Sequence, residues 1–134
     1  MSKPLKDDEI LGTIEIPKIN IKYPVFSKFD DELLKISPCK FYGKSPKEYG
    51  NLCIAGHNYS NSKFFSNLFL LEYGDEIYLY DNSEYKYIYK VFSSYEVKSS
   101  DMNPILNYNK NIKQLTLVTC NNLNQNRLIV KAEQ

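Results

Sequence analysis

Three side chains that could carry out chemistry stand at the ends of apolar runs in this sequence. The stretch "TLVTCNNLNQNRLIV", Thr116 to Val130, places Cys120 at the end of one apolar run and Arg127 at the start of the next, with six residues between them. The single histidine, His57, follows a third run, "NLCIAGH". A thiolate is a nucleophile, an imidazole transfers protons, and a permanently charged guanidinium stabilises negative charge on a carbonyl oxygen. If these strand ends converge, the sequence predicts nucleophilic catalysis on a carbonyl group.

The same residues also have ordinary structural interpretations. A lone histidine is most often a hydrogen-bonded or surface residue, and Arg127 alone would fit a surface ion pair or a charge that protects a strand edge. Cys39 and Cys53 are expected to be small core residues. The three cysteines form no CxxC pair and have no second histidine beside them, which argues against a zinc site. We therefore expect neither a metal nor a cofactor.

The elements that must position the reactive residues are short strands separated by turn residues, a spacing typical of a barrel or sandwich. Gly12 to Ile16 and Ile19 to Phe26 alternate apolar and polar residues, and a proline in each region suggests an edge or a bend. Helical turns are expected at 30–36, 62–71 and 102–106. Further strands are expected at 51–56, 75–81, 85–97, 114–120 and 127–133, with 75–81 and 85–97 forming a hairpin. The count is about eight strands, mostly antiparallel.

Length and charge limit the classes of protein to which the chain can belong. A length of 134 residues fits one domain, and 12 Tyr and 7 Phe favour strands. Because 17 Lys plus Arg balance 16 Asp plus Glu, no nucleic-acid partner is expected. The first residues carry charges where a signal peptide needs an apolar stretch, and no run approaches the ~18 apolar residues of a membrane helix. We expect a soluble chain as given, with residues 1–10 as an N-terminal tail.

Several segments, in order along the chain, resemble the sortases, cysteine transpeptidases of Gram-positive cell surfaces. "GTIEIPKINIKYPVF" is similar to the opening strands of that family, "NLCIAGHNYSNSKFFSNL" to the strand that ends in its catalytic histidine, and "TLVTC" followed by an arginine to its nucleophile motif. The resemblance implies a mainly β fold, the eight-stranded closed β-barrel of sortases with one or two short helices, over a catalytic domain at 11–134. The class is left open, although the compact chain is nearer classes A and D than B.

The resemblance also implies a reaction and a set of partners. Cys120 would attack the carbonyl after the threonine of an LPxTG-like sorting signal, Arg127 would hold the oxyanion, and His57 would protonate the departing amine. The thioester would pass to an amine acceptor, either a cell-wall precursor or a pilin lysine. Thr119 and Asn58 are the expected substrate-binding residues. The partners are surface proteins or pilins at the outer face of a Gram-positive membrane, which the chain would meet only through an anchor absent here.

Two other readings stay open at this point. The barrel could be a non-catalytic module that binds a peptide without turnover, or an enzyme that mainly hydrolyses its peptide for want of an amine. By family analogy, signal preference lies mainly in the irregular region at 99–113. Asp30 and its acidic neighbours are expected to be a solvated helix start, since no EF-hand calcium spacing is present.

Overall fold

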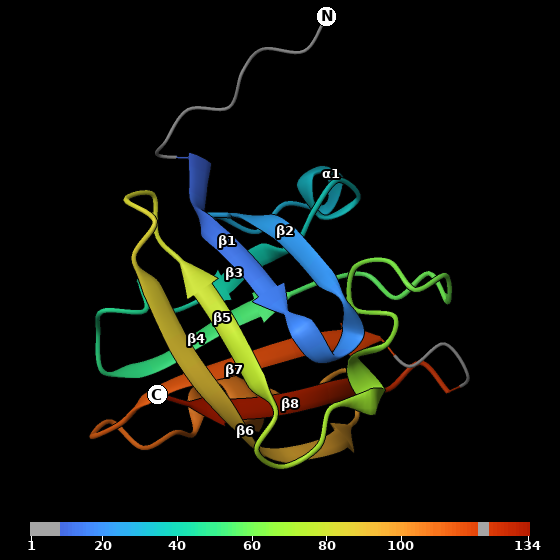
Figure 1. Cartoon of the computed structure of the whole chain (residues 1–134). Helices are drawn as coiled ribbons and strands as arrows, with labels where there is room; N and C mark the ends of the chain where they lie inside the picture. Colours follow the sequence, from blue (N-terminus) through green and yellow to red (C-terminus); the bar gives the residue numbers. More distant parts are fainter. Residues whose placement is uncertain (1–8, 121–123) are drawn as a thin grey trace, which may run out of the picture.

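The computed structural model describes residues 9–120 and 124–134, and its strands form a closed barrel (Figure 1). Two short α-helices, α1 at Asp31–Leu34 and α2 at Asn103–Leu106, lie between strands, as do 3-10 turns at Pro17–Ile19 and Leu68–Leu70. The eight strands of the described residues are β1 Ile10–Ile16, β2 Ile21–Phe26, β3 Cys39–Tyr42, β4 Gly50–Ala55, β5 Glu76–Tyr80, β6 Lys86–Val97, β7 Lys113–Cys120 and β8 Arg127–Glu133.

The order of strands around the barrel brings distant parts of the chain together. Neighbouring strands run β1-β2-β3-β4-β7-β8-β6-β5, and all pairs are antiparallel except β2 with β3 and β4 with β7. The predicted eight-stranded, mostly antiparallel barrel with short helices is therefore confirmed. The parallel pairing of β4 with β7 matters for the site, because it places the end of β4 beside the end of β7.

Side-chain alternation divides β4, β7 and β8 into an interior and an outer face. Leu52 and Ile54 of β4 belong to the apolar core of the barrel, together with Leu115 and Leu117 of β7. The residues between them point to the outer face, yet Cys53 there is also fully buried. Cys39 is buried too, and both thiols are free, so the prediction that these two cysteines are core residues is confirmed.

The helical turns match the sequence patterns at two places and differ at a third. Asp30 caps α1 by accepting hydrogen bonds from the backbone N–H groups of Glu32 and Leu33, which confirms the acidic helix start. The helical turn expected at 102–106 is α2. At 62–71 the predicted helix is wrong: only Leu68–Leu70 is helical, as a 3-10 turn. Phe64 takes a left-handed φ of 52°, which does not occur within an α-helix. The chain around it instead turns so that the side chain of the next residue, Phe65, is buried.

The ends of the chain lie partly outside the described residues. The N-terminal tail expected at 1–10 falls mostly there, and Ile10 already begins β1. The domain boundary expected at residue 11 stays a prediction. Within the described residues, no helix is both long and apolar enough to cross a membrane.

Candidate active site

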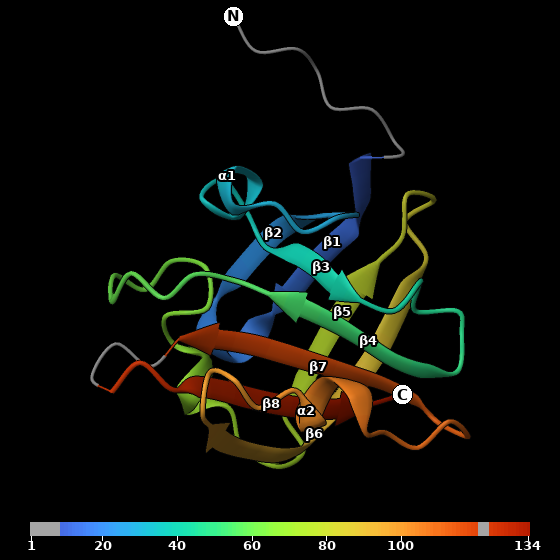
Figure 2. The ribbon, with the colours of Figure 1, turned by 180° about the vertical axis from the view of Figure 1, so that it is seen from behind.

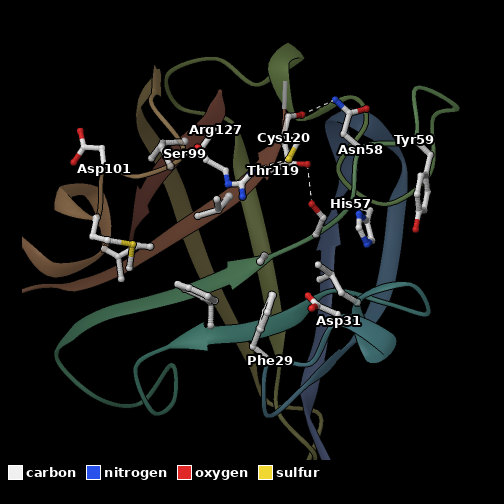
Figure 3. A pocket seen from close by; sticks show the side chains of 18 residues that line it. Phe29, Asp31, His57, Asn58, Tyr59, Ser99, Asp101, Thr119, Cys120 and Arg127 are labelled. Atoms are coloured by element: carbon white, nitrogen blue, oxygen red, sulfur yellow. Dashed lines mark hydrogen bonds between the residues drawn. The ribbon is translucent and has the colours of Figure 1, made fainter. Parts of the chain in front are cut away.

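Cys120 and Arg127 face each other as paired residues of neighbouring strands. They form the last pair of the β7–β8 ladder, opposite each other in the antiparallel register. The Arg127 Nη1 donates a hydrogen bond to the Cys120 Sγ at 2.5 Å. Figure 3 shows the guanidinium lying beside the sulfur. The structure therefore brings together the thiol and the cation that the sequence singled out.

His57 reaches the same region through the parallel pairing of β4 with β7. The Gly56 N–H donates to the Val118 carbonyl at 3.0 Å, which extends that pairing up to the histidine. A Cβ on Gly56 would lie 2.6 Å from the ring of Phe65, so any larger residue would have to displace that buried ring. The Phe65 N–H in turn donates to the His57 carbonyl at 3.0 Å. In Figure 3, His57 lies on the other side of Cys120 from Arg127.

The surroundings of His57 favour its neutral form. Burial lowers the pKa of the imidazole below its ordinary value of 6.5; the carboxylate of Asp31 opposes this change and the ammonium of Lys35 adds to it. The ring stacks on Tyr59 with centroids 4.8 Å apart and an interplanar angle of 21°. At neutral pH the histidine is thus mainly uncharged and able to accept a proton.

The two residues expected to bind substrate make bonds that fix the site's backbone. The Thr119 hydroxyl donates to the Gly56 carbonyl at 2.7 Å, and its side chain is buried. The Asn58 Nδ2 donates to the Cys120 carbonyl at 3.0 Å, and the Asn58 Oδ1 accepts from the Ser60 N–H. Both residues therefore tie the histidine turn to the end of β7. Their expected contact with substrate stays a prediction.

A groove of about 540 Å³ runs past the three reactive side chains. Most of its lining is apolar, and one wall falls in the region at 99–113, to which the family resemblance assigned signal preference. The strand ends supply Ala55, Val118 and Ile129, and two other walls supply Phe29, Leu34 and Phe41 on one side and Ser99, Asp101, Met102 and Ile105 on the other. A volume of this size with a few polar groups is typical of a site for a short peptide or a small ligand.

Sequence reasoning missed the wall around α1. Phe29 and Phe41 contact each other edge to face, with ring centroids 5.1 Å apart, and both are partly exposed toward the groove. Exposed aromatic residues flanking a short helix were the available signal. Only the tertiary structure shows that they line the same groove as His57.

The site can support acyl transfer through a thioester. A thiol lies between a proton-transferring imidazole and a guanidinium that can hold negative charge on a carbonyl oxygen. Within residues 9–120 and 124–134, no group of three or more metal-ligating side chains gathers. The arrangement therefore matches that of a cysteine nucleophile assisted by acid–base and electrostatic groups.

Comparison with known proteins connects this geometry to one family. Residues 14–134 match the protein-family model described as "Sortase domain". The chain is 31% identical over 123 residues to Sortase A of Bacillus anthracis and 30% identical over 125 residues to Sortase A of Staphylococcus aureus. These matches cover 91% of this chain but only 57% and 60% of the two relatives.

Solved structures agree with the sequence matches. Sortase C1 of Streptococcus agalactiae superposes with a TM-score of 0.85 at 30% identity, covering 97% of this chain and 69% of the other. Sortase C of Clostridium perfringens, solved with the C-terminal cell wall sorting motif, gives a TM-score of 0.82 at 30% identity, covering 96% and 71%. Relatives named as sortase A and as sortase C are thus both similar to this chain.

Proposed function

This chain belongs to the sortase family, and we propose that it is a cysteine transpeptidase that cleaves a sorting signal of the LPxTG type and transfers the product to an amine. The observation that carries the proposal is the pairing of Cys120 with Arg127, in a groove that His57 also lines. A solved sortase C with a bound sorting motif, similar over 96% of this chain, supports the substrate class.

The first half of the reaction forms a thioester. His57, neutral because burial lowers its pKa, accepts the proton of the Cys120 thiol as the sulfur attacks the carbonyl carbon of the signal's threonine. Arg127 stabilises the negative charge that develops on the carbonyl oxygen. The bond from that carbon to the next nitrogen then breaks, and His57 returns the proton to the departing amine.

The second half resolves the thioester with an amine. The acceptor nitrogen attacks the thioester carbon, His57 takes the proton that the amine loses, and the thiol leaves with a proton restored to it. The acceptor is a cell-wall precursor or a pilin lysine, which places the enzyme at the outer face of a Gram-positive membrane. Water in the same role would give hydrolysis instead.

The apolar groove supports recognition of the signal's leading residues. Its two walls offer Phe29, Ile105 and Met102 to an extended peptide whose threonine carbonyl lies at Cys120. An apolar surface of this kind favours a leucine and a proline over charged residues. Thr119 and Asn58 would then act mainly by holding the backbone around the reacting carbonyl.

Intact mass spectrometry with a panel of sorting-signal peptides tests the proposal. A mass increase equal to the N-terminal half of one peptide, lost in Cys120→Ala and kept in Cys39→Ala, is the expected result. Cys39 is the matched control because its thiol is buried away from the groove. A product that changes when an amine is added identifies transpeptidation. Peptide binding without an adduct or cleavage, on reduced and folded protein, would instead show a non-catalytic binding module.

A further inference from the structure

A row of polar side chains lies directly beside the apolar floor of the groove. On the outer face of the sheet, the register aligns Ala55, Val118 and Ile129 across β4, β7 and β8, and all three line the groove. The next row across the same strands consists of Cys53, Thr116 and Lys131. Lys131 is only 6% exposed, which is rare for a lysine.

This polar row is covered by α2, which lies against β7 and β8 in the view from behind (Figure 2). The Lys131 Nζ donates hydrogen bonds to the Pro104 carbonyl and to the Thr116 Oγ1, the second at 3.0 Å. The Asn51 Nδ2, from the start of β4, donates to the carbonyls of Pro104 and Ile105 at 3.3 and 3.1 Å. The Thr116 hydroxyl completes the network by donating to the Asn51 Oδ1 at 2.7 Å.

The network supplies hydrogen-bond donors to carbonyl groups that the four-residue helix α2 leaves without partners. The last carbonyls of a helix have no partner within it, and Pro104 and Ile105 are buried, so water cannot satisfy these oxygens. The side chains of Asn51, from β4, and Lys131, from β8, donate hydrogen bonds to them instead. Burial lowers the pKa of Lys131, and the Cys53 thiol opposes this change. The cost of burying the ammonium must therefore be offset by its bonds to the Pro104 carbonyl and the Thr116 hydroxyl.

The opposite side of this turn forms the wall of the groove. Met102 and Ile105 line the groove, and Asp101 fixes the start of the turn by accepting a hydrogen bond from the Asn103 N–H at 2.9 Å. Ile105 thus contributes its carbonyl to the polar network and its side chain to the peptide groove. Any loosening of the bonds to Lys131 or Asn51 displaces that wall.

We propose that Lys131 and Asn51 are positioning residues that clamp α2 to β4, β7 and β8 and so set the groove's selectivity for an apolar residue of the peptide. The selectivity rests on the proposed function, whereas the clamp does not. Neither residue lines the groove, so neither touches the peptide or the reacting atoms.

Hydrogen exchange tests the clamp without any substrate. Three amides of the turn are hydrogen-bonded within it, from Ile105 and Leu106 to the Met102 carbonyl and from Asn107 to the Asn103 carbonyl. Lys131→Met keeps most of the length of the side chain and removes its ammonium group, and these amides should then exchange at least about tenfold faster. Amides of the β1–β2 pair should change much less. Equal acceleration everywhere, or none in the turn, would refute the clamp.

Two further variants complete this test. Lys22→Met, an exposed lysine of β2 whose ammonium lies 5.3 Å from the Tyr80 ring centroid, makes the same chemical change away from α2 and should leave the turn unaffected. If Lys131→Met does not fold, Asn51→Asp answers the same question. It keeps the oxygen that accepts from Thr116 and removes both N–H groups that bind α2.

Peptide kinetics test the consequence for selectivity. With LPxTG-type peptides carrying Leu or Ala at the first motif position, Lys131→Met should raise KM for the Leu peptide and reduce the Leu-to-Ala ratio of kcat/KM about tenfold. The value of kcat at saturation should change little. A fall in kcat with an unchanged KM and ratio would refute the selectivity role. If the wild type cleaves no peptide, the proposed function fails, and the exchange experiment still decides the clamp.

Discussion

The Thr119 hydroxyl joins the strand end that carries Cys120 to the turn that carries His57. Its removal should lower the free energy of unfolding by an amount that follows from the structure. Thr119→Val keeps the shape of the side chain, so no cavity forms, but it leaves the Gly56 carbonyl without the donor that now lies 2.7 Å from it. Gly56 is buried, and an unsatisfied buried acceptor costs about 1–3 kcal/mol.

That loss converts to a change in melting temperature. With an unfolding entropy near 2.1 cal/mol/K per residue, a chain of 134 residues loses about 4–11 °C in Tm for this range of free energy. Thermal unfolding followed by circular dichroism, with urea titration for the free energy itself, measures it. Thr119→Ser is the matched control, because it keeps the hydroxyl and should retain most of the stability that Thr119→Val loses.

The same variant separates two roles for Thr119. If the residue acts through Gly56, Thr119→Val should lose stability and activity together, since His57 follows Gly56 directly and a 1 Å displacement of a reacting group can cost about 100-fold in rate. A variant as stable as the wild type would refute this reasoning. Unchanged stability with a large loss of kcat would show instead that the hydroxyl contacts the peptide.

The remaining predictions concern Arg127, His57 and the glycine that precedes the histidine. Arg127→Ala should reduce kcat/KM by about 100-fold with the barrel still folded, because it removes an oxyanion donor; peptide cleavage measures this, and unchanged turnover would contradict it. The single His57 should titrate by NMR below 6.5, and lower still in Asp31→Asn, since that carboxylate favours the protonated ring; a midpoint above 6.5 would be inconsistent with burial as the main cause. Because the unfolded chain then binds this proton more tightly, His57 lowers the free energy of unfolding as pH falls from 6.5 through the folded pKa. Gly56→Ala should cost about 1–3 kcal/mol in urea unfolding, since its Cβ meets the buried Phe65 ring, and wild-type stability would show that the ring can move.

Much of the local structure could be predicted from the sequence because its causes are local. Alternating apolar residues define β1 and β2, and the Asp30 side chain caps α1 with its own neighbours. The failure at 62–71, in contrast, involves a contact with a distant part of the chain. Apolar residues there recur at a helical period, but the left-handed Phe64 breaks the helix, and its N–H is bound by the Tyr23 hydroxyl of a distant strand. A period in one segment cannot report that contact.

In the candidate site, too, features with local causes were predictable and long-range contacts were not. The types of Cys120, His57 and Arg127 and their places after apolar runs predicted the chemistry, and the last two strands predicted a Cys120–Arg127 encounter. The α2 wall of the groove falls in the region at 99–113, to which the family resemblance assigned signal preference. The wall around α1 was not predicted, because it reaches the groove only through the tertiary packing of the barrel. The burial of Lys131 was even less predictable, since a lysine in an apolar strand is usually exposed. Here its ammonium is buried and donates hydrogen bonds to the Pro104 carbonyl of another segment and to the Thr116 hydroxyl.

The sequence by itself determined the kind of chemistry, the family and the strands that carry the reactive groups, since residue types and short-range periodicity are properties of the chain alone. The tertiary structure decided which strand ends meet, through the parallel pairing of β4 with β7, whose residues are about sixty positions apart in the sequence. It also decided which walls enclose the groove and which polar groups hold them. Those outcomes depend on burial and hydrogen-bond satisfaction over the whole barrel, because each buried polar group must find its partner wherever the fold places one.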